Sequence, residues 1–443
     1  MGAGIRSSWS RIRRTRIEGE KTLKDRPLSD KPVVAIVCDA MYPYSQGGRE
    51  FRYQGLLPKL AKHVDIHVYT MRWWTGPKVY TEAGVTFHAI APRMSMYTKS
   101  GRRSIIHGLI FGICSLRLLT GRFDVLEADQ IPYFHLFPLR LIATVKRKPL
   151  LASWHEVWGP EAWYSYLRWA GWLGWLIESF SFRIPDHIFA VSAETSARLR
   201  EFIGERASVT LVPNGIDTTV IAEVPASPFK ADIVTVGRLI DHKRVHDLLE
   251  VIAALHARGV RATCRIIGDG PDRLALQQQA RTLGIDAYVE FLTDVSEQKE
   301  LYSLIKASRL FVSLSTREGF GIAVLEAIAC GSAVLTTDAP DNLAQHLAKR
   351  YTRGFVCDTS VKEVTSTVER ILAQPTPDNS STDSWVAEYS WETMVDLVVD
   401  VYSDLGTLPP VTAEQPKEHN PIAEEELVGP ESGHPSPQAT WRW

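Results

Sequence analysis

Short, continuous apolar runs alternate along this chain with stretches of helical periodicity, and this alternation constrains the fold more than any other feature. The first run, P-V-V-A-I-V-C-D at 32–39, is typical of a strand buried on both faces of a parallel sheet. Strand and helix in turn predict a doubly wound α/β domain over 32–212. Its strands are predicted at 32–39, 65–70, 85–90, 124–127, 150–154 and 187–191, and its helices at 48–62, 104–119, 161–182 and 193–203.

A turn-rich segment then breaks both periodicities, with P-N-G-I-D at 213–217 and P-A-S-P at 225–228, and is read as a linker. A second alternation follows and predicts another domain over 213–385. The predicted fold class is therefore α/β, with two doubly wound Rossmann-like domains that face each other across a cleft. The second set of strands is predicted at 232–236, 262–267, 289–292, 310–314 and 333–336, and its helices at 245–258, 272–283, 297–307, 321–330 and 361–372.

The two ends of the chain differ from the parts between them. Residues 1–31 are predicted to be a basic flexible arm, and residues 406–443 a disordered acidic tail rich in proline. The amphipathic helix within 386–405 is predicted to cross back onto the first domain. With a formal net charge of −1, the chain has no overall attraction to nucleic acid.

Composition narrows the cellular setting. The 5 cysteines include no C-x-x-C pair, so neither a zinc site nor a disulfide framework is indicated, and a reducing compartment is expected. No apolar run reaches the roughly 20 residues that span a bilayer, and the basic N-terminus lacks the apolar core of a secretory signal. The predicted location is cytoplasmic.

The segment 318–331, E-G-F-G-I-A-V-L-E-A-I-A-C-G, combines two features on one predicted helix. Glycines at its start let backbone amides approach an anion at the positive end of the helix. Glu326 lies about one turn further in, within the same sector as apolar residues, where a carboxylate is costly without hydrogen-bond donors. A nucleoside diphosphate would satisfy both, with its ribose hydroxyls donating to Glu326; a structural Glu326–arginine pair is the alternative.

Other glycine turns and charged residues follow predicted strands. Gly237 precedes Arg238, and Lys243 comes five residues later, a pair of cations suited to a diphosphate or simply solvated at the surface. Gly268 begins G-D-G-P, which permits close backbone approach but is not a dinucleotide fingerprint. In the first domain, Gly47 and Gly48 open a helix, either as a second phosphate contact or as a flexible turn. His155 ends a strand, where a sugar contact and a structural role are both open.

The order G-G, H-E-V-W-G, V-P-N-G-I-D, G-R-L-x-x-x-K, G-D-G-P and E-G-F-G-x-x-x-x-E resembles the retaining nucleotide-sugar glycosyltransferases of family GT4, which have the GT-B fold. The resemblance covers roughly 32–405. It implies that Glu326 holds the donor ribose. It also implies that Arg238 and Lys243 neutralise the diphosphate, that Gly48 approaches phosphate and that His155 contacts the transferred sugar. The remaining donor contacts would come from Glu318, Gly319, Phe320, Gly321 and Ile322.

The sequence departs from the family pattern after Thr337-Asp338, where A-P-D-N at 339–342 replaces the usual glycine pair and glutamate, and Arg244 replaces the usual glycine. The reaction implied is transfer of a hexose-type sugar from a UDP- or GDP-linked donor with retention of configuration. The leaving phosphate itself would assist deprotonation of the acceptor. No cofactor and no metal are expected, because cations and helix amides can stabilise the leaving diphosphate.

Three rival functions fit parts of the same pattern. A glycoside hydrolase built on Glu318 and Glu326 fits poorly, because eight helical residues span about 12 Å, whereas hydrolase carboxylates lie about 5–9.5 Å apart. A nucleotide-sugar epimerase of the same architecture and a non-catalytic donor-binding subunit both remain open.

Two predicted helices on the acceptor side are compatible with contact to a lipid surface. Lys99, Arg102 and Arg103 precede the apolar helix 104–119, and four tryptophans lie close together in 161–182. Basic charge beside apolar and aromatic residues suits a membrane interface, although both helices would equally serve to cover the first sheet. The acceptor is expected to be a glycan, a lipid-linked molecule or another hydroxyl compound, met at the inner face of the membrane.

Overall fold

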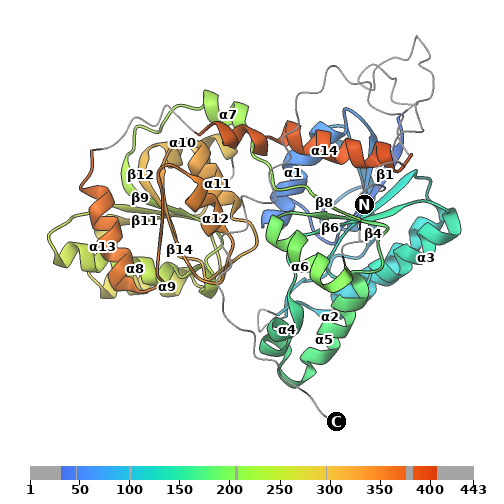
Figure 1. Ribbon diagram of the computed structural model, residues 1–443, viewed down its shortest axis with the longest axis horizontal. Helices are drawn as coiled ribbons and strands as arrows, with labels where there is room; N and C mark the ends of the chain where they lie inside the picture. Colours follow the sequence, from blue (N-terminus) through green and yellow to red (C-terminus); the bar gives the residue numbers. More distant parts are fainter. Residues whose placement is uncertain are drawn as a thin grey trace, which may run out of the picture.

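The protein is described here by a computed structural model covering residues 31–45, 47–98, 102–204, 208–295, 297–375 and 383–406. Two separate lobes, each built on one sheet, lie side by side (Figure 1). The predicted flexible arm, apart from Lys31, and the predicted tail, apart from Gly406, lie outside the described residues. The α/β class with two Rossmann-like sheets, predicted from alternating periodicity, is confirmed.

The first lobe contains an eight-stranded sheet in the order β3-β4-β2-β1-β5-β6-β7-β8. All neighbouring strands are parallel except β3, which pairs antiparallel with β4 at the edge. The central strands β5 and β6 are wholly buried; β6 is largely apolar, whereas β5 also buries the carboxylates of Glu127 and Asp129. The strands are β1 (Val33–Val37), β2 (Asp65–Met71), β3 (Val79–Glu82), β4 (Val85–Ala91), β5 (Val125–Asp129), β6 (Leu150–Trp154), β7 (His187–Ala190) and β8 (Val209–Leu211).

Helices cover both faces of this sheet. One core joins the sheet to α1 (Gly48–Leu60) and α14 (Trp391–Asp404). The opposite core joins it to α2 (Ile105–Ser115), α3 (Leu136–Lys146), α5 (Gly171–Ser181) and α6 (Ala193–Ile203). In the part of the chain that the structure describes, no helix is long and apolar enough to cross a membrane.

The second lobe contains a six-stranded parallel sheet in the order β11-β10-β9-β12-β14-β16. A separate two-stranded parallel ladder joins β13 (Arg317–Glu318) to β15 (Asp341–Asn342) at the cleft. The sheet strands are β9 (Ala231–Val236), β10 (Cys264–Ile267), β11 (Val289–Leu292), β12 (Ser308–Ser313), β14 (Ala333–Thr337) and β16 (Gly354–Cys357). The helices are α7 (Thr218–Glu223), α8 (Val245–Ala257), α9 (Arg273–Thr282), α10 (Gln298–Lys306), α11 (Ile322–Ala329), α12 (Ala344–Arg350) and α13 (Val361–Leu372).

The C-terminal helix α14 returns from the second lobe and packs along α1 of the first (Figure 1). Its first residue, Trp391, fills the space beside two glycines: a Cβ at Gly55 would lie 2.2 Å from the indole ring, and one at Gly215 would lie 2.5 Å from it. Near the other end, the Tyr402 hydroxyl donates to Glu127 of β5 at 2.5 Å. Helix α14 is therefore part of the first lobe's core, although it follows the second lobe in sequence.

The prediction of a single helix over 161–182 is wrong. The segment forms a helical hairpin of α4 (Gly159–Leu167), a 3-10 turn (Arg168–Ala170) and α5. Arg168 leaves the helical conformation at φ 56° and ψ −130°. Gly171 and Gly174 then let the two helices of the hairpin meet. A Cβ at Gly171 would lie 2.5 Å from the Tyr164 backbone, and one at Gly174 would lie 2.2 Å from the Trp163 ring. Apolar periodicity continues through the turn, so pattern alone could not locate it.

Candidate functional site

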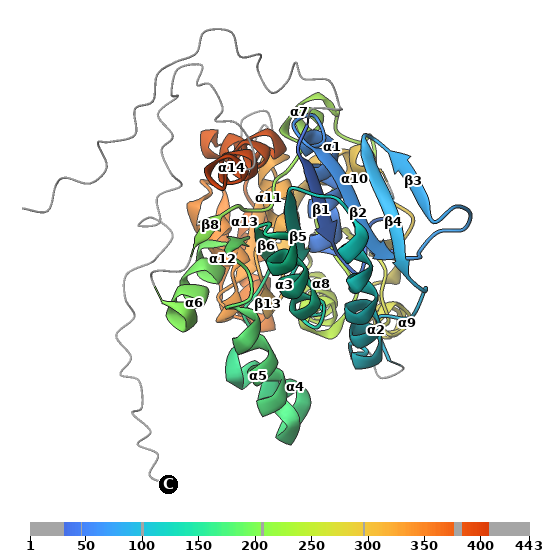
Figure 2. The same cartoon turned by 90° about the vertical axis from the view of Figure 1, so that its right-hand side faces the viewer.

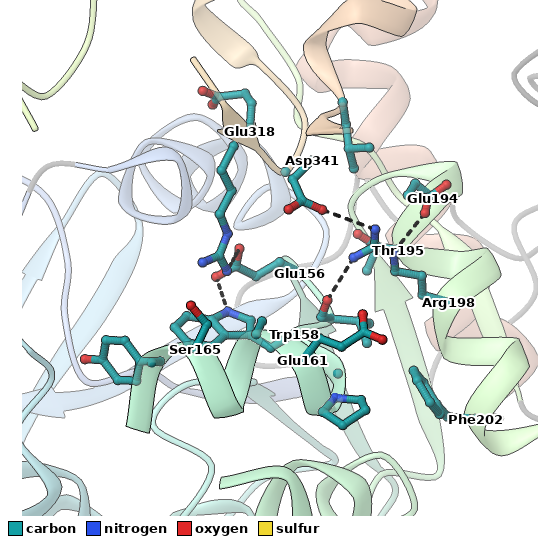
Figure 3. A pocket seen from close by; sticks show the side chains of 18 of the residues that line it. Glu156, Trp158, Glu161, Ser165, Glu194, Thr195, Arg198, Phe202, Glu318 and Asp341 are labelled. Atoms are coloured by element: carbon teal, nitrogen blue, oxygen red, sulfur yellow. Dashed lines mark hydrogen bonds and ion pairs between the residues drawn. The ribbon is translucent and has the colours of Figure 1, made fainter. Parts of the chain in front are cut away.

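A cavity of about 870 Å³ lies between the lobes. The first lobe lines it with the loop after β6, with α4 and with α6. The second lobe contributes the β13–β15 ladder and the start of the α11 loop. Figure 3 shows Glu156 and Trp158 from the first lobe and Glu318 and Asp341 from the second around this space. Parallel strands of open α/β sheets direct their carboxyl ends to such a cleft, as the sequence predicted.

Contacts cross the cleft at the loop after β6. A Cβ added at Gly319 would lie 3.1 Å from the carbonyl oxygen of His155, so the two backbones nearly touch. Beside them, Arg317 pairs with Glu156 at 2.8 Å, and its guanidinium lies 4.4 Å from the centre of the Trp158 ring. The structure therefore brings two predicted site segments, 155–159 and 318–321, into direct contact.

A second ionic contact joins the lobes where the sequence departs from the family pattern. Asp341 points toward Arg198 of α6, which also pairs with Glu194 (Figure 3). The Arg198–Asp341 distance is 3.6 Å and both side chains are exposed, so the pair contributes little stability. Its neighbour Asn342 is buried and donates to the Thr337 carbonyl at 2.8 Å, which fixes the shape of the 338–342 loop.

Glu326 lies in the middle of α11 and is buried, as the sequence predicts. The Tyr302 hydroxyl of α10 donates to its Oε1 at 3.1 Å. Within the described residues Glu326 has no ion pair, so the alternative of a structural arginine partner is not what the structure shows. Burial raises the pKa of Glu326 to about 7, and the Tyr302 hydrogen bond only partly opposes this rise.

The α11 amino end has the geometry of an anion site. Gly321 precedes the helix with φ +90°, and a Cβ there would lie 2.4 Å from the Ala344 side chain, so glycine is required. The helix runs over 322–329, against the predicted 321–330. Ile322 provides its first residue, while the Phe320 ring turns away into the core against Tyr389, with ring centres 5.9 Å apart. Phe320 can therefore contribute backbone to a ligand, but not its ring.

The predicted turns of the second lobe meet at neighbouring strand ends. A Cβ at Gly268, after β10, would lie 2.1 Å from the Gly237 carbonyl oxygen, after β9. Lys243 forms an ion pair with Glu318, which places two predicted site residues together. Arg238 is exposed, and its guanidinium lies 5.2 Å from the centre of the Tyr97 ring of the first lobe. Arg238 therefore faces the first lobe across the cleft, although its side chain is exposed.

In the first lobe, His155 rests on buried charge. Its Nε2 lies 3.0 Å from Oδ1 of Asp129, the last residue of β5, although the two atoms are not aligned as a hydrogen bond. Arg49 lies 3.0 Å from Asp129 and also 3.0 Å from Asp39. Burial alone would raise the pKa of Asp129, but Arg49 and then His155 lower it. His155 is thus held beside an ionised carboxylate that a second cation supports.

Gly47 and Gly48 occupy the predicted position at the start of α1. A Cβ at Gly47 would lie 2.7 Å from a Glu50 oxygen, whereas one at Gly48 would meet no atom within 4 Å. Gly48 is thus the more accessible of the two for a ligand. Arg49, next in the chain, points instead to the buried carboxylates below His155.

Sequence reasoning missed Asp39, Asp129, Tyr302 and Arg317. The two aspartates stand at or just after the ends of buried strands, the same position that singled out His155. The position of a polar residue at the end of a buried strand could therefore have identified both aspartates as site candidates. Tyr302 and Arg317 carry no comparable local signal, because each acts through a partner distant in sequence.

Glu178 of α5 was also missed, and it fixes the loop that carries His155. It accepts hydrogen bonds from the backbone of Trp158 at 3.0 Å and of Gly159 at 3.1 Å. It also accepts from the Trp163 indole at 2.7 Å and the Tyr133 hydroxyl at 3.1 Å. Burial raises the pKa of Glu178 in spite of these four donors.

We expect Glu178→Ala to lower the free energy of unfolding by about 3–5 kcal/mol, because it leaves four donors unpaired around a buried site. Thermal or urea unfolding measures the change. Glu194→Ala, which removes a half-exposed partner of Arg198, is the control and should cost less than about 1 kcal/mol. A Glu178→Ala protein as stable as this control would contradict the assignment.

Two Rossmann-like lobes with this charged cleft define the GT-B class of glycosyltransferases. Solved structures of that class share the fold. HepE of Anabaena, solved in complex with UDP and glucose, has a TM-score of 0.63 and 16% identity, and covers 84% of this chain and 100% of its own. A sucrose-phosphate synthase from Thermosynechococcus elongatus has a TM-score of 0.69 and 14% identity, over 85% and 99%.

The sequence comparisons identify the family. The profile described as "Glycosyltransferase Family 4" matches residues 47–220, and "Glycosyl transferases group 1" matches 219–386. This chain belongs to glycosyltransferase family 4.

Curated relatives are distant. Glycogen synthase of Mycobacterium tuberculosis is 25% identical over 51% of this chain and 56% of its own length, so the chain spans about half of that relative. A GDP-mannose-dependent α-(1-6)-phosphatidylinositol monomannoside mannosyltransferase of Mycolicibacterium smegmatis is 24% identical over 75% of this chain and 88% of its own length.

Proposed function

We propose that this protein transfers a hexose-type sugar from a nucleoside diphosphate sugar to a hydroxyl acceptor. The observation that carries the proposal is Glu326: a buried carboxylate that lacks an ion pair within the described residues, in the helix whose glycine-flanked start faces the cleft. Tyr302 donates to one of its oxygens at 3.1 Å, which leaves acceptor capacity for ribose hydroxyls. A structural carboxylate would instead be expected to have a cation beside it.

The diphosphate would lie between the α11 amino end and the cations at the end of β9. Lys243 is a point charge that would exchange its ion pair with Glu318 for the phosphate oxygens, and Arg238 would add a planar fork from the exposed side. Charge develops on the diphosphate as the bond to the sugar breaks, so fixed donors here stabilise the transition state. Gly237 and Gly268 let the turns after β9 and β10 pack closely beside these cations.

His155 is proposed to hydrogen-bond the transferred sugar, with Asp129 and Arg49 fixing the imidazole from below. Transfer with retention needs no protein nucleophile if the leaving phosphate assists deprotonation of the acceptor hydroxyl on the same face. The cationic residues supply the charge stabilisation that a divalent ion would otherwise give, so we propose a metal-independent reaction. Contact between the 155–159 and 318–321 loops would exclude water, which competes as an acceptor.

The acceptor is proposed to be a glycan or lipid-linked hydroxyl compound that enters from the α4 side of the cavity. Half-exposed aromatic residues line this side, among them Trp158 and Tyr166, together with the exposed Arg102. Aromatic surface and a guanidinium suit a sugar with an anionic attachment. The mannosyltransferase relative named above acts, by its name, on a phosphatidylinositol monomannoside. We propose that the protein works on the cytoplasmic side of the membrane.

A thermal-shift panel of UDP, GDP, ADP and their sugar conjugates tests the donor assignment. One nucleoside diphosphate is expected to raise the melting temperature at a concentration where the other bases do not, because binding to the folded state alone stabilises it. A panel with no shift would overturn the proposal. Incubating the selected donor alone separates the rivals: a stereoisomer without free nucleotide would show an epimerase, and binding without turnover a non-catalytic subunit.

A further inference from the structure

The outer side of three neighbouring helices carries an unusual concentration of apolar side chains. Of the twenty large apolar side chains exposed in the described part of the chain, fifteen lie between Ile105 and Phe180. Helices α2, α3 and α5 cover the same face of the first sheet, because all three contribute to one core on that side. Their outward sides therefore form a common surface; Figure 2 shows the three helices from this side. We call it the apolar face.

The exposed apolar side chains of each helix lie on its solvent-facing side, while the opposite side of the helix is packed in the core. On α2, Ile106 and Ile113 point outward, with Ile113 67% exposed, while Phe111 on the opposite side is fully buried. On α3, Leu141 and Val145 are exposed, while Ile142 and Ala143 between them are buried in the core. These helices are thus apolar on both sides, which is typical of elements that meet a second apolar phase.

The α4–α5 hairpin extends the apolar face at its tip. Trp169 stands in the turn and is 83% exposed, and Trp172 and Phe180 follow along the outer side of α5. Tryptophan has an apolar body with one polar N–H group, and it concentrates at the boundary between lipid headgroups and hydrocarbon. A second protein copy would equally cover apolar surface, so the charge around the face decides between them.

That charge is predominantly positive, and the exposed Asp186, just after α5, is paired with Arg140 of α3 at 2.8 Å. Residues 105–123 and 136–148 contain no Asp or Glu, and the only carboxylate of α5, Glu178, is buried. A symmetric contact between two copies would bring like charges together, whereas an anionic bilayer is attracted to them. The exposed cations at the ends of these helices are Arg102, Arg117, Arg122, Arg147, Arg168 and Arg183.

The apolar face meets the cleft at one corner. Arg103, just before α2, donates its backbone N–H to the Tyr166 hydroxyl of α4 at 2.9 Å. The Arg102 guanidinium lies 5.7 Å from the centre of the Tyr166 ring, and both residues line the cavity. The same hairpin therefore carries Trp169 outside and lines the cavity with α4 inside.

From this arrangement we propose that the apolar face docks on an anionic lipid bilayer, with the α4–α5 tip inserted at the headgroup level. The cavity then opens beside the membrane surface, where a lipid-linked acceptor can present its hydroxyl to the cleft while its chain stays in the bilayer. This consequence rests on the proposed function, but docking itself can be measured without it.

Vesicle co-sedimentation of the full chain tests the docking. The parent protein is expected to bind phosphatidylcholine vesicles that contain phosphatidylglycerol, and to bind phosphatidylcholine alone at least tenfold more weakly. Ile106→Glu with Ile113→Glu, and separately Trp169→Ser with Trp172→Ser, should each lower binding at least tenfold. The control, Leu274→Glu with Phe229→Glu, changes side chains that are both 72% exposed but lie on the second lobe, and it should bind like the parent.

Three results would overturn the inference: no binding by the parent protein, unchanged binding by both variants, or a parent dimer in solution that the α2 substitutions dissociate. The last would assign the apolar face to a second copy. Nucleotide thermal shifts on the same proteins keep the two proposals apart. A normal thermal shift with nucleotide but no vesicle binding would contradict only the docking proposal. Vesicle binding without any thermal shift would contradict only the proposed donor site.

Discussion

Replacing Lys243 by alanine is expected to lower the turnover number by about 10²–10³-fold, with a smaller rise in the KM for the donor. The reason is that the ammonium group opposes charge that grows on the leaving diphosphate in the transition state, in a cleft that excludes water. Its pair with Glu318 is partly exposed, so its loss should change the free energy of unfolding by less than about 1 kcal/mol. Release of nucleoside diphosphate from the donor selected by the thermal-shift panel measures the turnover.

Arg258→Ala is the matched control for Lys243. Arg258 also belongs to the second lobe and also pairs with a carboxylate, Glu369, at 2.7 Å. It caps the carboxyl end of α8, which runs back to the edge of the sheet away from the cleft. The control should keep parental turnover. Equal activity of Lys243→Ala and Arg258→Ala would show that Lys243 does not stabilise the leaving diphosphate.

Glu326→Gln is expected to weaken nucleotide binding by about tenfold to a hundredfold. A hydrogen bond to a charged group contributes about 1.5–3 kcal/mol, and glutamine keeps the shape of the side chain while removing the charge. Calorimetric titration with the selected nucleoside diphosphate measures the loss. A variant that binds as tightly as the parent would contradict the assignment of Glu326 as the acceptor for the ribose hydroxyls.

The pH dependence of binding provides an independent test of the same carboxylate. Ribose hydroxyls donate to the ionised form, and the pKa of Glu326 in the free protein is about 7. Affinity should therefore be constant above pH 7 and fall as the pH drops below it, by at most about tenfold per unit. Glu326→Gln should bind with no such dependence, and the same slope in both proteins would assign it to another group.

Stability should show the opposite trend. The pKa of Glu326 rises from its ordinary 4.5 in the unfolded chain to about 7 in the folded protein. The folded state therefore holds the proton more tightly. The stability that this protonated carboxyl group contributes is fully present below pH 4.5 and is lost as the pH rises through 7. This amounts to about 3 kcal/mol at about 1.4 kcal/mol per pKa unit. Glu326→Gln, which does not titrate, should gain stability relative to the parent by that amount between pH 4.5 and 8.

Much of the fold followed from local periodicity. The runs at 32–39, 150–154 and 310–314 form strands as their apolar character predicts, because no charged residue interrupts them, and each is mostly buried. Several elements were not predicted, among them β3, α3, β8, α7, α12 and β16, and two of them show why. Helix α3 follows a loop with one proline, Pro132, and contains another, Pro138, near its start, which obscured its period. Strand β16 is only half-buried, so its apolar pattern is weak.

The sequence by itself determined the two α/β lobes, the glycine turns at the strand ends and the buried position of Glu326 on its helix. These properties depend on the order of residues within a few turns of backbone, which periodicity records. The tertiary structure alone decided that Tyr302 rather than an arginine accompanies Glu326. It also decided that Lys243 meets Glu318 and that Arg317 reaches Glu156 across the cleft. Those pairs join residues far apart in the chain, and their meeting depends on strand order and on how the two lobes close, which no local pattern encodes.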